Sequence, residues 1–386
     1  MITNGFTFVA FLVLLAGIIV IVEKKSNSKI FNYIPGVVML YFFAMLLATF
    51  GLWEKTDSVN TYYKGVKDNL LPAMIFLMLL RCDLRKIFKL GPKMLIGFFS
   101  ASISIGVGFM VSYAIFKGFF PADTWKSFAA LAGSWMGGTG NMAAIQGALN
   151  VPDSAMGYTL LIDSIDYSIW VMILLALVPF GHLFNKWTKA DTKVIDEIGR
   201  ELEKDKENMR TTIEFSDMII LLGSSLMVSS LSQALSVHLP QSDFLTVGTW
   251  TVIIATVIGV LCTLTPFGKL PGSSQISNVM LYIIIGLIAS RANFAELTQA
   301  PIYIVAGFVI LIVHAVVLAI IAKIFKLDLF TCGVASLANI GGVASAPILA
   351  ASYSEALIPI GVLMAMLGYV VGTGGGLFVG KILSML

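Results

Sequence analysis

The sequence predicts an all-α polytopic membrane protein built from two related halves that form an inverted repeat. Three observations support this fold class: the composition, a series of long apolar segments, and two copies of one glycine-rich run. The chain has 386 residues, of which 58% are hydrophobic and 12% are charged, and its mean hydropathy is +0.91. This composition excludes a soluble globule of this size. We therefore expect a multi-pass protein of the bacterial cytoplasmic (inner) membrane.

The apolar segments divide into two sets separated by a charged stretch. About twenty apolar residues cross a bilayer as a helix, and on that measure the segments of the first half lie near 6–22, 33–53, 70–81, 93–118, 126–149 and 155–184. Those of the second half lie near 218–238, 246–266, 275–290, 301–322, 329–351 and 355–384. Residues 185–217 are densely charged with no apolar stripe. The domains predicted are a first repeat (1–184), a cytoplasmic linker (185–217) and a second repeat (218–386).

The two sets also repeat in detail. Residues 77–84 align with residues 287–294, and each stretch is followed by a short polar turn and a proline, Pro92 or Pro301, that opens the next helix. The alignment indicates an internal duplication of about 205 to 210 residues.

Orientation follows from the Lys and Arg residues in short loops. The basic loops are residues 23–29, 81–93, the linker and 323–326. Full crossing by every apolar segment would put the last two on the opposite side from the first two. Re-entrant hairpins at the two glycine-rich runs would leave about five crossings per half and place all four basic loops in the cytoplasm. Discontinuous helices that cross one another remain the alternative.

The glycine-rich runs are the strongest functional signal. One occupies residues 131–144 and contains Gly137-Gly138, and the other occupies residues 336–347 and contains Gly341-Gly342. Consecutive glycines let a helix unwind, and unwound backbone at membrane depth is tolerated only where it is buried or lines a wet cavity. Two broken segments in corresponding positions indicate the binding site of a transporter. Close helix packing through small residues is the alternative interpretation.

Two carboxylates follow the first run. Asp163 and Asp166 are three residues apart, which places both on one face of a helix. A charged carboxylate near the bilayer centre costs on the order of 3 kcal/mol, so two of them in one turn are expected only where they have a function or a charged partner. We interpret both as a coupling-ion site for Na⁺ or H⁺. The alternative is that one of them pairs with Arg81 or Arg291.

Other polar residues in apolar segments allow two interpretations each. Hydroxyls and amides near the glycine pairs offer oxygen ligands or hydrogen bonds within their own helices, at Ser134, Thr139, Asn141, Gln146, Asn339 and Ser345. His314 is predicted to form an interhelical hydrogen bond, with proton relay as the alternative. Tyr369 and the glycine run 372–376 are typical of a helix-packing face. Arg81 and Arg291 are predicted to snorkel at segment ends, with anchoring of a substrate carboxylate as the alternative.

Other classes of function find little support. The net charge of +3 carries little information, because charge in such proteins mainly sets topology, and nothing indicates nucleic-acid binding. The cysteines Cys82, Cys262 and Cys332 lack metal-ligand spacing and are predicted to be apolar fillers. Walker A, HExxH, CxxC and GxSxG motifs are absent, so we expect no enzyme activity and no cofactor apart from a bound Na⁺.

The run Gly-Gly-Thr-Gly-Asn, the acidic helix after it, and the second run Asn-Ile-Gly-Gly-Val-Ala-Ser-Ala-Pro resemble the uncharacterised YjcL-like family of bacterial membrane proteins. That family is similar to sodium/glutamate symporters and, more remotely, to hydroxycarboxylate symporters, bile acid/sodium symporters and cation/proton antiporters. The resemblance covers nearly the whole chain. It implies a scaffold domain from the first two segments of each half, a mobile core domain from the other four, elevator-like movement and a homodimer.

Carried over to this chain, the resemblance implies a site for substrate and ion at the two crossovers. The first crossover is Gly137, Gly138, Thr139, Gly140 and Asn141, and the second runs from Gly341 and Gly342 to Ser345. Asp163 and Asp166 would bind the ion, with Asn141 as a further Na⁺ ligand. Val343 and Ala344 make the second crossover less polar than the first, which leaves the number of ion sites open.

The sequence thus favours a secondary active transporter that moves a small organic anion or amino-acid-like solute with Na⁺ or H⁺. Two alternatives remain, a cation/proton antiporter without an organic substrate and a membrane protein that binds a solute without transporting it.

Overall fold

The computed structural model describes residues 1–25, 36–80, 87, 90–190, 212–242, 245–292, 300–354 and 357–386. These residues are helical almost throughout. The helices of the first half are α1 (Gly5–Lys25), α2 (Gly36–Thr49), α3 (Asp57–Leu80), α5 (Gly91–Phe116), α6 (Thr124–Gly137), α7 (Thr139–Leu149), α8 (Ala155–Leu177) and α9 (Gly181–Thr188). Those of the second half are α11 (Phe215–Ser236), α12 (Val247–Cys262), α13 (Ser273–Ala289), α14 (Ala300–Phe325), α15 (Leu329–Ile340), α16 (Gly342–Tyr353) and α17 (Ile358–Leu383).

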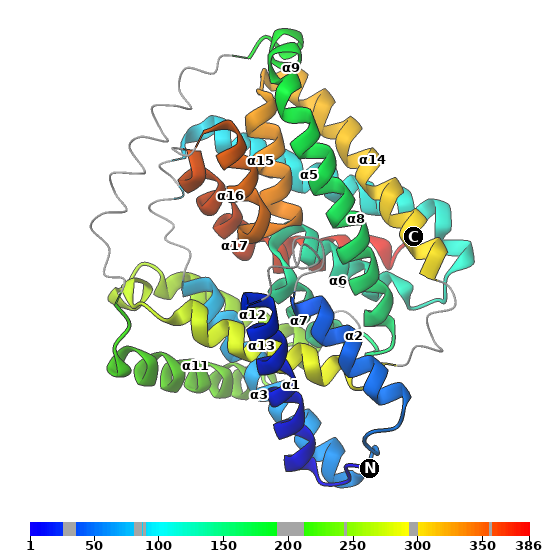
Figure 1. Ribbon diagram of the computed structural model, residues 1–386, viewed down its shortest axis with the longest axis vertical. Helices are drawn as coiled ribbons and strands as arrows, with labels where there is room; N and C mark the ends of the chain where they lie inside the picture. The colour runs from blue at the N-terminus through cyan, green and yellow to red at the C-terminus, as the bar shows by residue number, and fades with distance from the viewer. Residues whose placement is uncertain are drawn as a thin grey trace.

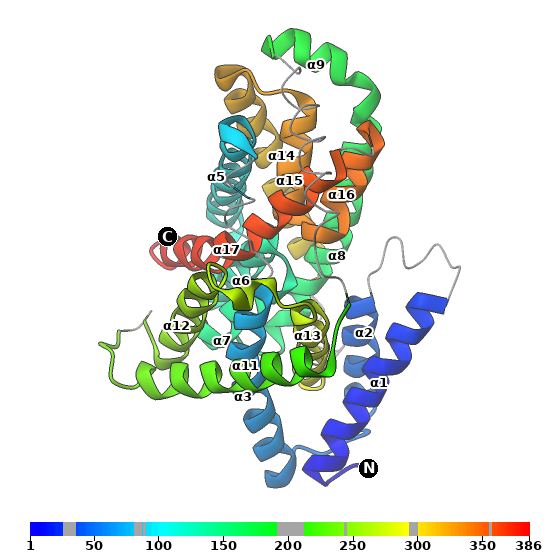
Figure 2. The same cartoon turned by 90° about the vertical axis from the view of Figure 1, so that its left-hand side faces the viewer.

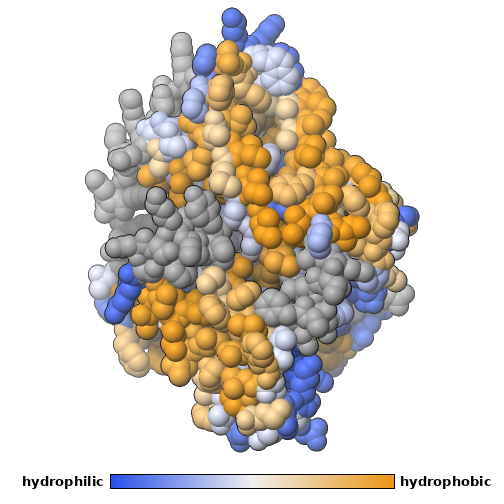
Figure 3. Space-filling model, turned by 45° about the vertical axis from the view of Figure 1, so that its right-hand side comes forward, coloured by the Kyte–Doolittle hydropathy of each residue, from blue (hydrophilic) through white to orange (hydrophobic). Residues whose placement is uncertain are grey.

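Several helices have the length and composition of membrane spans. Within the described ranges, 6 helical stretches are long and apolar enough to cross a bilayer. They are Gly5–Lys25, Gly91–Phe119, Ala155–Thr188, Phe215–Ser236, Pro301–Phe325 and Ile358–Leu383. Large apolar side chains on these helices point outward, such as Leu14, Ile103 and Ile312, which are 62%, 61% and 62% exposed. Figure 3 shows hydrophobic residues over much of one face. Such a surface is stable in contact with lipid, so the predicted all-α polytopic class is confirmed.

The two halves contain the same order of elements. Three helices come first, then one long helix, a broken pair and a final long helix: α1, α2, α3, α5, α6–α7, α8, and then α11, α12, α13, α14, α15–α16, α17. Pro92 is the second residue of α5 and Pro301 the second residue of α14. Because proline has a fixed φ and lacks the N–H that a first turn leaves unpaired, both prolines open their helices as predicted.

Two predicted boundaries need correction. Helix α3 begins at Asp57, well before the predicted start near 70, because its first half is polar and a count of apolar residues misses it. The predicted linker 185–217 includes the end of α9 and the start of α11. Its residues 191–211 lie outside the described ranges. Most of the first two predicted basic loops lie outside those ranges as well.

The helices pack in two groups, visible at the bottom and the top of Figure 1 and again in Figure 2. The first group consists of α1, α2, α3, α11, α12 and α13, and the second of α5, α6, α8, α14, α15, α16 and α17. Helix α7 contacts both groups, through α3 and α12 on one side and α6 and α17 on the other. The resemblance implied that the first group would hold two segments of each half. The third helices, α3 and α13, also belong to it.

Glycines of α7 and α12 lie at close contacts in the seam between the groups. A Cβ on Gly140 would lie 3.0 Å from Met78 Cε, and one on Gly147 would overlap the side chain of Leu71. A Cβ on Gly248 would lie 2.8 Å from the carbonyl oxygen of Gly147. The two groups therefore approach one another at positions where no side chain fits.

Threonine hydroxyls connect the groups beside these glycines. Thr246 and Thr249, at the start of α12, both donate hydrogen bonds to the carbonyl oxygen of Ala148, with O···O distances of 3.0 and 2.9 Å. The last turn of α7 has carbonyls without partners in its own helix, so these hydroxyls satisfy one of them.

Candidate functional site

The first glycine-rich run breaks a helix as predicted. Helix α6 ends at Gly137 and α7 begins at Thr139, while Gly138 between them has φ 85° and ψ 173°, a conformation that glycine adopts and other residues avoid. A Cβ on Gly133 in α6 would overlap the side chain of Ile145 in α7. The two arms therefore lie side by side, and the segment folds back as a hairpin.

The second run has the same form. Helix α15 ends at Ile340, and α16 begins at Gly342, whose φ is +58°. A Cβ on Gly333 in α15 would lie 3.1 Å from Leu349 Cδ2 in α16. The sequence left hairpins and crossing helices open, and the structure contains two hairpins.

Close packing through small residues is present as well. A Cβ on Gly137 would lie 2.9 Å from the Cα of Gly372, and one on Gly376 would lie 2.7 Å from the backbone nitrogen of Gly133. Helix α17 therefore packs on α6 through its glycine run, and the predicted packing face is confirmed. Tyr369 differs, because it lines the cavity described next.

The tips of the two hairpins line one cavity of about 230 Å³. The first hairpin contributes Gly138, Thr139 and Gly140, and the second contributes the range 340–344. The N-termini of α7 and α16 therefore both face this space. The first N–H groups of a helix lack partners within it and carry a partial positive charge, so this arrangement suits a negatively charged group.

Asp163 of α8 lies at the same cavity. Its Oδ1 accepts hydrogen bonds from Ser134 Oγ and Trp135 Nε1, both at 3.0 Å. The two donors are in the last turn of α6, so the carboxyl group is fixed beside the break in the first hairpin. Ser134 also lines the cavity. The structure thus brings together Asp163, Ser134 and both glycine pairs, except that Gly137 lies behind the tip against α17.

Asp166 is not among the residues that line this cavity. Its side chain is fully buried and faces α14, where a Cβ on Gly307 would lie 2.9 Å from Asp166 Cγ. Within the described part of the chain, neither of its carboxyl oxygens has a hydrogen-bond partner. Residues three apart on a helix differ by about 60° in direction, and α8 lies between α6 and α14. This offset directs Asp163 to the cavity and Asp166 away from it.

The two asparagines hold the hairpins to their neighbours. Asn141 Oδ1 accepts a hydrogen bond from Thr373 Oγ1 of α17 at 2.5 Å, and its Nδ2 donates to the Gly137 carbonyl at 2.6 Å. Asn339 Oδ1 accepts one from Ser102 Oγ of α5 at 2.7 Å. Neither amide is among the residues that line the cavity. The tentative Na⁺ site of Asp163, Asp166 and Asn141 is therefore not assembled in this structure.

The remaining polar candidates have varied surroundings. Thr139 lines the cavity, while Ser345 is buried beside Gly341 and Tyr167. His314 of α14 contacts Ser104 of α5 through Nδ1 at 2.7 Å and Ser336 of α15 through Nε2 at 2.8 Å. The predicted interhelical hydrogen bonding of this histidine is confirmed.

Arg81 lies outside the described ranges. Arg291 follows the end of α13, where its guanidinium carbon lies 4.3 Å from the centroid of the Tyr63 ring. Neither Asp163 nor Asp166 forms an ion pair with it, so the alternative of a buried Asp–Arg291 pair does not hold here.

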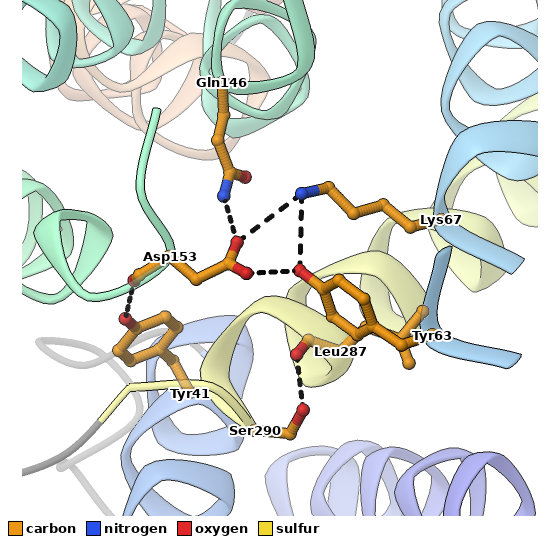
Figure 4. A network of polar contacts seen from close by, with 7 residues as sticks. All are labelled: Tyr41, Tyr63, Lys67, Gln146, Asp153, Leu287 and Ser290. Carbon is orange, nitrogen blue, oxygen red and sulfur yellow. Dashed lines mark hydrogen bonds and ion pairs between the residues drawn. The ribbon is translucent and has the colours of Figure 1, made fainter. Parts of the chain in front are cut away.

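Asp153, in the turn before α8, connects the two groups of helices and was missed by the sequence analysis. Its carboxylate accepts hydrogen bonds from Tyr63 Oη at 2.5 Å, Lys67 Nζ at 3.5 Å and Gln146 Nε2 at 2.7 Å, and its carbonyl accepts one from Tyr41 Oη at 3.4 Å (Figure 4). The available signal was weak. An aspartate after Val-Pro marks a turn, and Tyr63 and Lys67 are four residues apart in a stretch that was not assigned to a helix.

The fold and the cavity define the class: a polytopic α-helical membrane protein in which two broken helices meet at one cavity. Residues 10–386 match the model of DUF819, a family described as proteins of unknown function, so the chain belongs to that family. The chain is also 23% identical over 375 residues to the uncharacterized membrane protein YjcL of Bacillus subtilis (strain 168), and the match covers 92% of each chain. The resemblance to the YjcL-like family is thus confirmed.

Proposed function

We propose that the protein is a secondary active transporter that couples the symport of a small organic anion or amino-acid-like solute to Na⁺ or H⁺. The observation that carries this proposal is the single cavity lined by the tips of both broken helices and by Asp163. Irregular backbone at membrane depth persists where it serves a binding cavity, and paired broken helices are typical of such sites in transporters.

The chemistry of the cavity supports this class of solute. The N-termini of α7 and α16 offer N–H groups to a carboxylate. Asp163 offers a negative charge to a coupling cation or to the ammonium group of an amino acid. The described residues that line the cavity include no Lys, Arg or His. A solute carboxylate would therefore be held by backbone, and the cation by Asp163.

The arrangement of helices supports an elevator-type movement. We propose that the halves 1–184 and 218–386 form an inverted repeat joined by the linker, and that the group containing both hairpins moves against the other group. The contact between the groups at Gly140, Gly147 and Gly248 would be the surface along which this displacement occurs. A homodimer in the bacterial inner membrane, held together by the stationary group, completes this proposal.

A cation/proton antiporter is the second candidate. One observation favours it: Asp163 is the only Asp or Glu among the described residues that line the cavity, and no basic residue there would repel a cation. An antiporter would exchange Na⁺ for H⁺ across a liposome with no organic solute present. A symporter would move Na⁺ only together with its solute.

The test is uptake into liposomes that contain the purified protein, driven by an inward Na⁺ or H⁺ gradient. Labelled glutamate, aspartate and citrate are the first probes. We expect Asp163→Asn to reduce uptake on the order of 100-fold, because the amide keeps the acceptor for Ser134 and Trp135 but loses the charge. Asp123→Asn, at a residue that is 68% exposed, is the matched control.

Full uptake by Asp163→Asn would refute the assignment of this residue. Gradient-driven Na⁺/H⁺ exchange without any solute would favour the antiporter. A solute that raises the melting temperature of the protein yet shows no flux under either gradient would indicate a membrane protein that binds without transporting.

A further inference from the structure

We propose that a second pocket, distinct from the cavity of the hairpins, binds an oxyanion such as a carboxylate or a phosphate group. The pocket has a volume of about 360 Å³ and is lined by Arg291, Lys55, Lys64, Asn60, Tyr63 and the turn 153–154. It shares no lining residue with the cavity of the hairpins. The proposal does not depend on transport, because binding is measured directly.

Arg291 carries the argument. Its Nε and Nη2 are buried and have no hydrogen-bond partner among the residues that the structure describes. A buried charged donor without an acceptor is costly, so a folded protein normally supplies one. Contact with the face of the Tyr63 ring, 4.3 Å from the guanidinium carbon, stabilises the charge but accepts no hydrogen bond in the plane of the guanidinium. An oxyanion in the pocket would provide the missing acceptors.

The backbone around Arg291 is held in place. Trp53 Nε1 donates a buried hydrogen bond of 3.0 Å to the carbonyl of Ser290, and Arg291 N donates one of 3.1 Å to the carbonyl of Ile288. The guanidinium therefore projects from a fixed helix end. A preformed position of this kind lowers the entropy lost on binding.

The carboxylate in the pocket is already engaged. Asp153 bonds to Tyr63, Lys67 and Gln146 (Figure 4), and its ion pair is with Lys67 at 3.5 Å. Arg291 forms no ion pair with a described residue. The described lining thus presents three cationic side chains around one carboxylate whose charge Lys67 already balances.

The solvation of Arg291 is consistent with this view. Burial lowers the pKa of its guanidinium from the ordinary value, and the neighbouring Tyr63 and Asp153 act in the opposite direction. The charge is therefore poorly solvated. An added anion would stabilise it through charge-assisted hydrogen bonds.

The planar shape of the Arg291 guanidinium indicates the kind of ligand that the pocket would bind. A planar guanidinium presents paired N–H donors that match two oxygens of a carboxylate or a phosphate, while Lys55 and Lys64 are exposed and add positive charge at the mouth of the pocket. Such an anion comes either from a soluble compound or from the headgroup of an anionic lipid. The two sources are distinguished by experiment.

The first arm measures melting temperatures of the detergent-purified full chain in sodium phosphate and in sodium chloride, with choline chloride added to the chloride buffer so that Na⁺ concentration, ionic strength and pH are all equal. We expect phosphate to raise the melting temperature of the wild type by about 2–4 °C, and Arg291→Gln to abolish that rise. In chloride alone, Arg291→Gln should melt at or above the wild type, because an unpaired buried charge is removed. Lys126→Gln, which removes a surface charge paired with Asp123, should keep the phosphate response.

The second arm uses nanodiscs of phosphatidylcholine with and without phosphatidylglycerol. A rise in melting temperature that requires phosphatidylglycerol and is lost in Arg291→Gln would assign the site to a lipid headgroup. Should Arg291→Gln fail to fold, the exposed pair Lys55→Gln/Lys64→Gln is expected to weaken the response severalfold. The proposal is overturned if neither phosphate nor anionic lipid shifts the wild type, or if the Arg291 and the paired lysine variants respond fully.

Discussion

The two broken helices differ although both turn at a glycine pair. In the first hairpin the break is polar: Ser134 and Trp135 donate hydrogen bonds to Asp163, and Thr139 lines the cavity. In the second, Val343 and Ala344 occupy the equivalent tip. The cavity therefore has one side with a carboxylate and hydroxyls, and another side that offers mainly backbone.

In the proposed transporter, this difference would place the cation and the anion at different parts of the cavity. Cations require oxygen ligands and negative charge, which Asp163 of α8 and the hydroxyls of the first hairpin bring to one side of the cavity. Anions need N–H groups, which the first turns of α7 and α16 both supply. The two broken segments thus share a backbone turn at a glycine pair while their side chains differ. The predictions below test that asymmetry, from the largest expected effect to the smallest.

Gly137→Ala should destabilise more than Gly341→Ala. A methyl group on Gly137 would overlap the backbone of Gly368 on α17, which cannot move aside, and we expect a loss of about 3 kcal/mol in the free energy of unfolding. On Gly341 it would meet the side chains of Ser345 and Tyr167 and no backbone atom among its nearest contacts, so a smaller loss of about 1–2 kcal/mol is expected. Denaturant unfolding in detergent measures both. Equal losses would show that the hairpins are equally constrained.

Gly138→Ala should lower the stability of the protein more than Gly342→Ala, for a different reason. The φ and ψ of Gly138, 85° and 173°, lie in a region that is essentially restricted to glycine, at a cost of about 2 kcal/mol or more for alanine. Gly342 has a φ of +58° and no atom within 4 Å of an added Cβ, so only the left-handed strain of about 1 kcal/mol applies. Comparison of melting temperatures should rank them in this order, and a reversed order would contradict the assigned backbone conformations.

The hydrogen bonds that hold Asn141 and Asn339 should contribute nearly equally to the free energy of unfolding. Thr373→Val removes the donor to Asn141, and Ser102→Ala removes the donor to Asn339. Each leaves a buried amide oxygen short of a partner, which costs about 1–2 kcal/mol. Thr373→Ser keeps the hydroxyl and serves as the control. If one variant is neutral, that hairpin is held by packing alone.

Ser134→Ala should have the smallest effect on folding. Trp135 still donates to Asp163, so a loss of about 0.5–1 kcal/mol in unfolding free energy is expected. Our proposal further expects that the rise in melting temperature produced by NaCl, relative to choline chloride at equal ionic strength, is weakened in this variant and unchanged in Ser345→Ala. A larger effect in Ser345→Ala would move the cation to the second hairpin.

Sequence reasoning reached the repeated order of helices and both breaks because these depend on local chemistry. Paired glycines make a helix easier to break, and Pro92 and Pro301 open helices for reasons confined to their own residues. The functions of Asp163 and Asp166 could not be separated, since spacing gives a relative angle but not the identity of the neighbouring helices. The contact between Asp166 and Gly307 joins residues far apart in the chain.

The Asp153 network was beyond reach for a similar reason. Its partners come from α2, α3 and α7, and only the packing of the two groups brings them together. The start of α3 was missed because residues 57–69 are mostly polar, and the core contacts of this part rest on a few residues at helical spacing, Val59, Tyr63 and Val66. Hydropathy alone identifies the apolar part of this helix, residues 71–80, which is buried, and omits the rest.

The glycine seam has a mechanical consequence. Where Gly140 and Gly147 meet the opposite group, the side chains of Met78 and Leu71 lie against them, so sliding along the seam would move these two side chains out of the glycine positions. The resting position would also be stabilised by the hydrogen bonds to the carbonyl of Ala148 and to the carboxylate of Asp153. A large side chain at Gly248 would lie between the two groups and block their relative movement. The fold could remain intact while the two groups became immobile relative to each other.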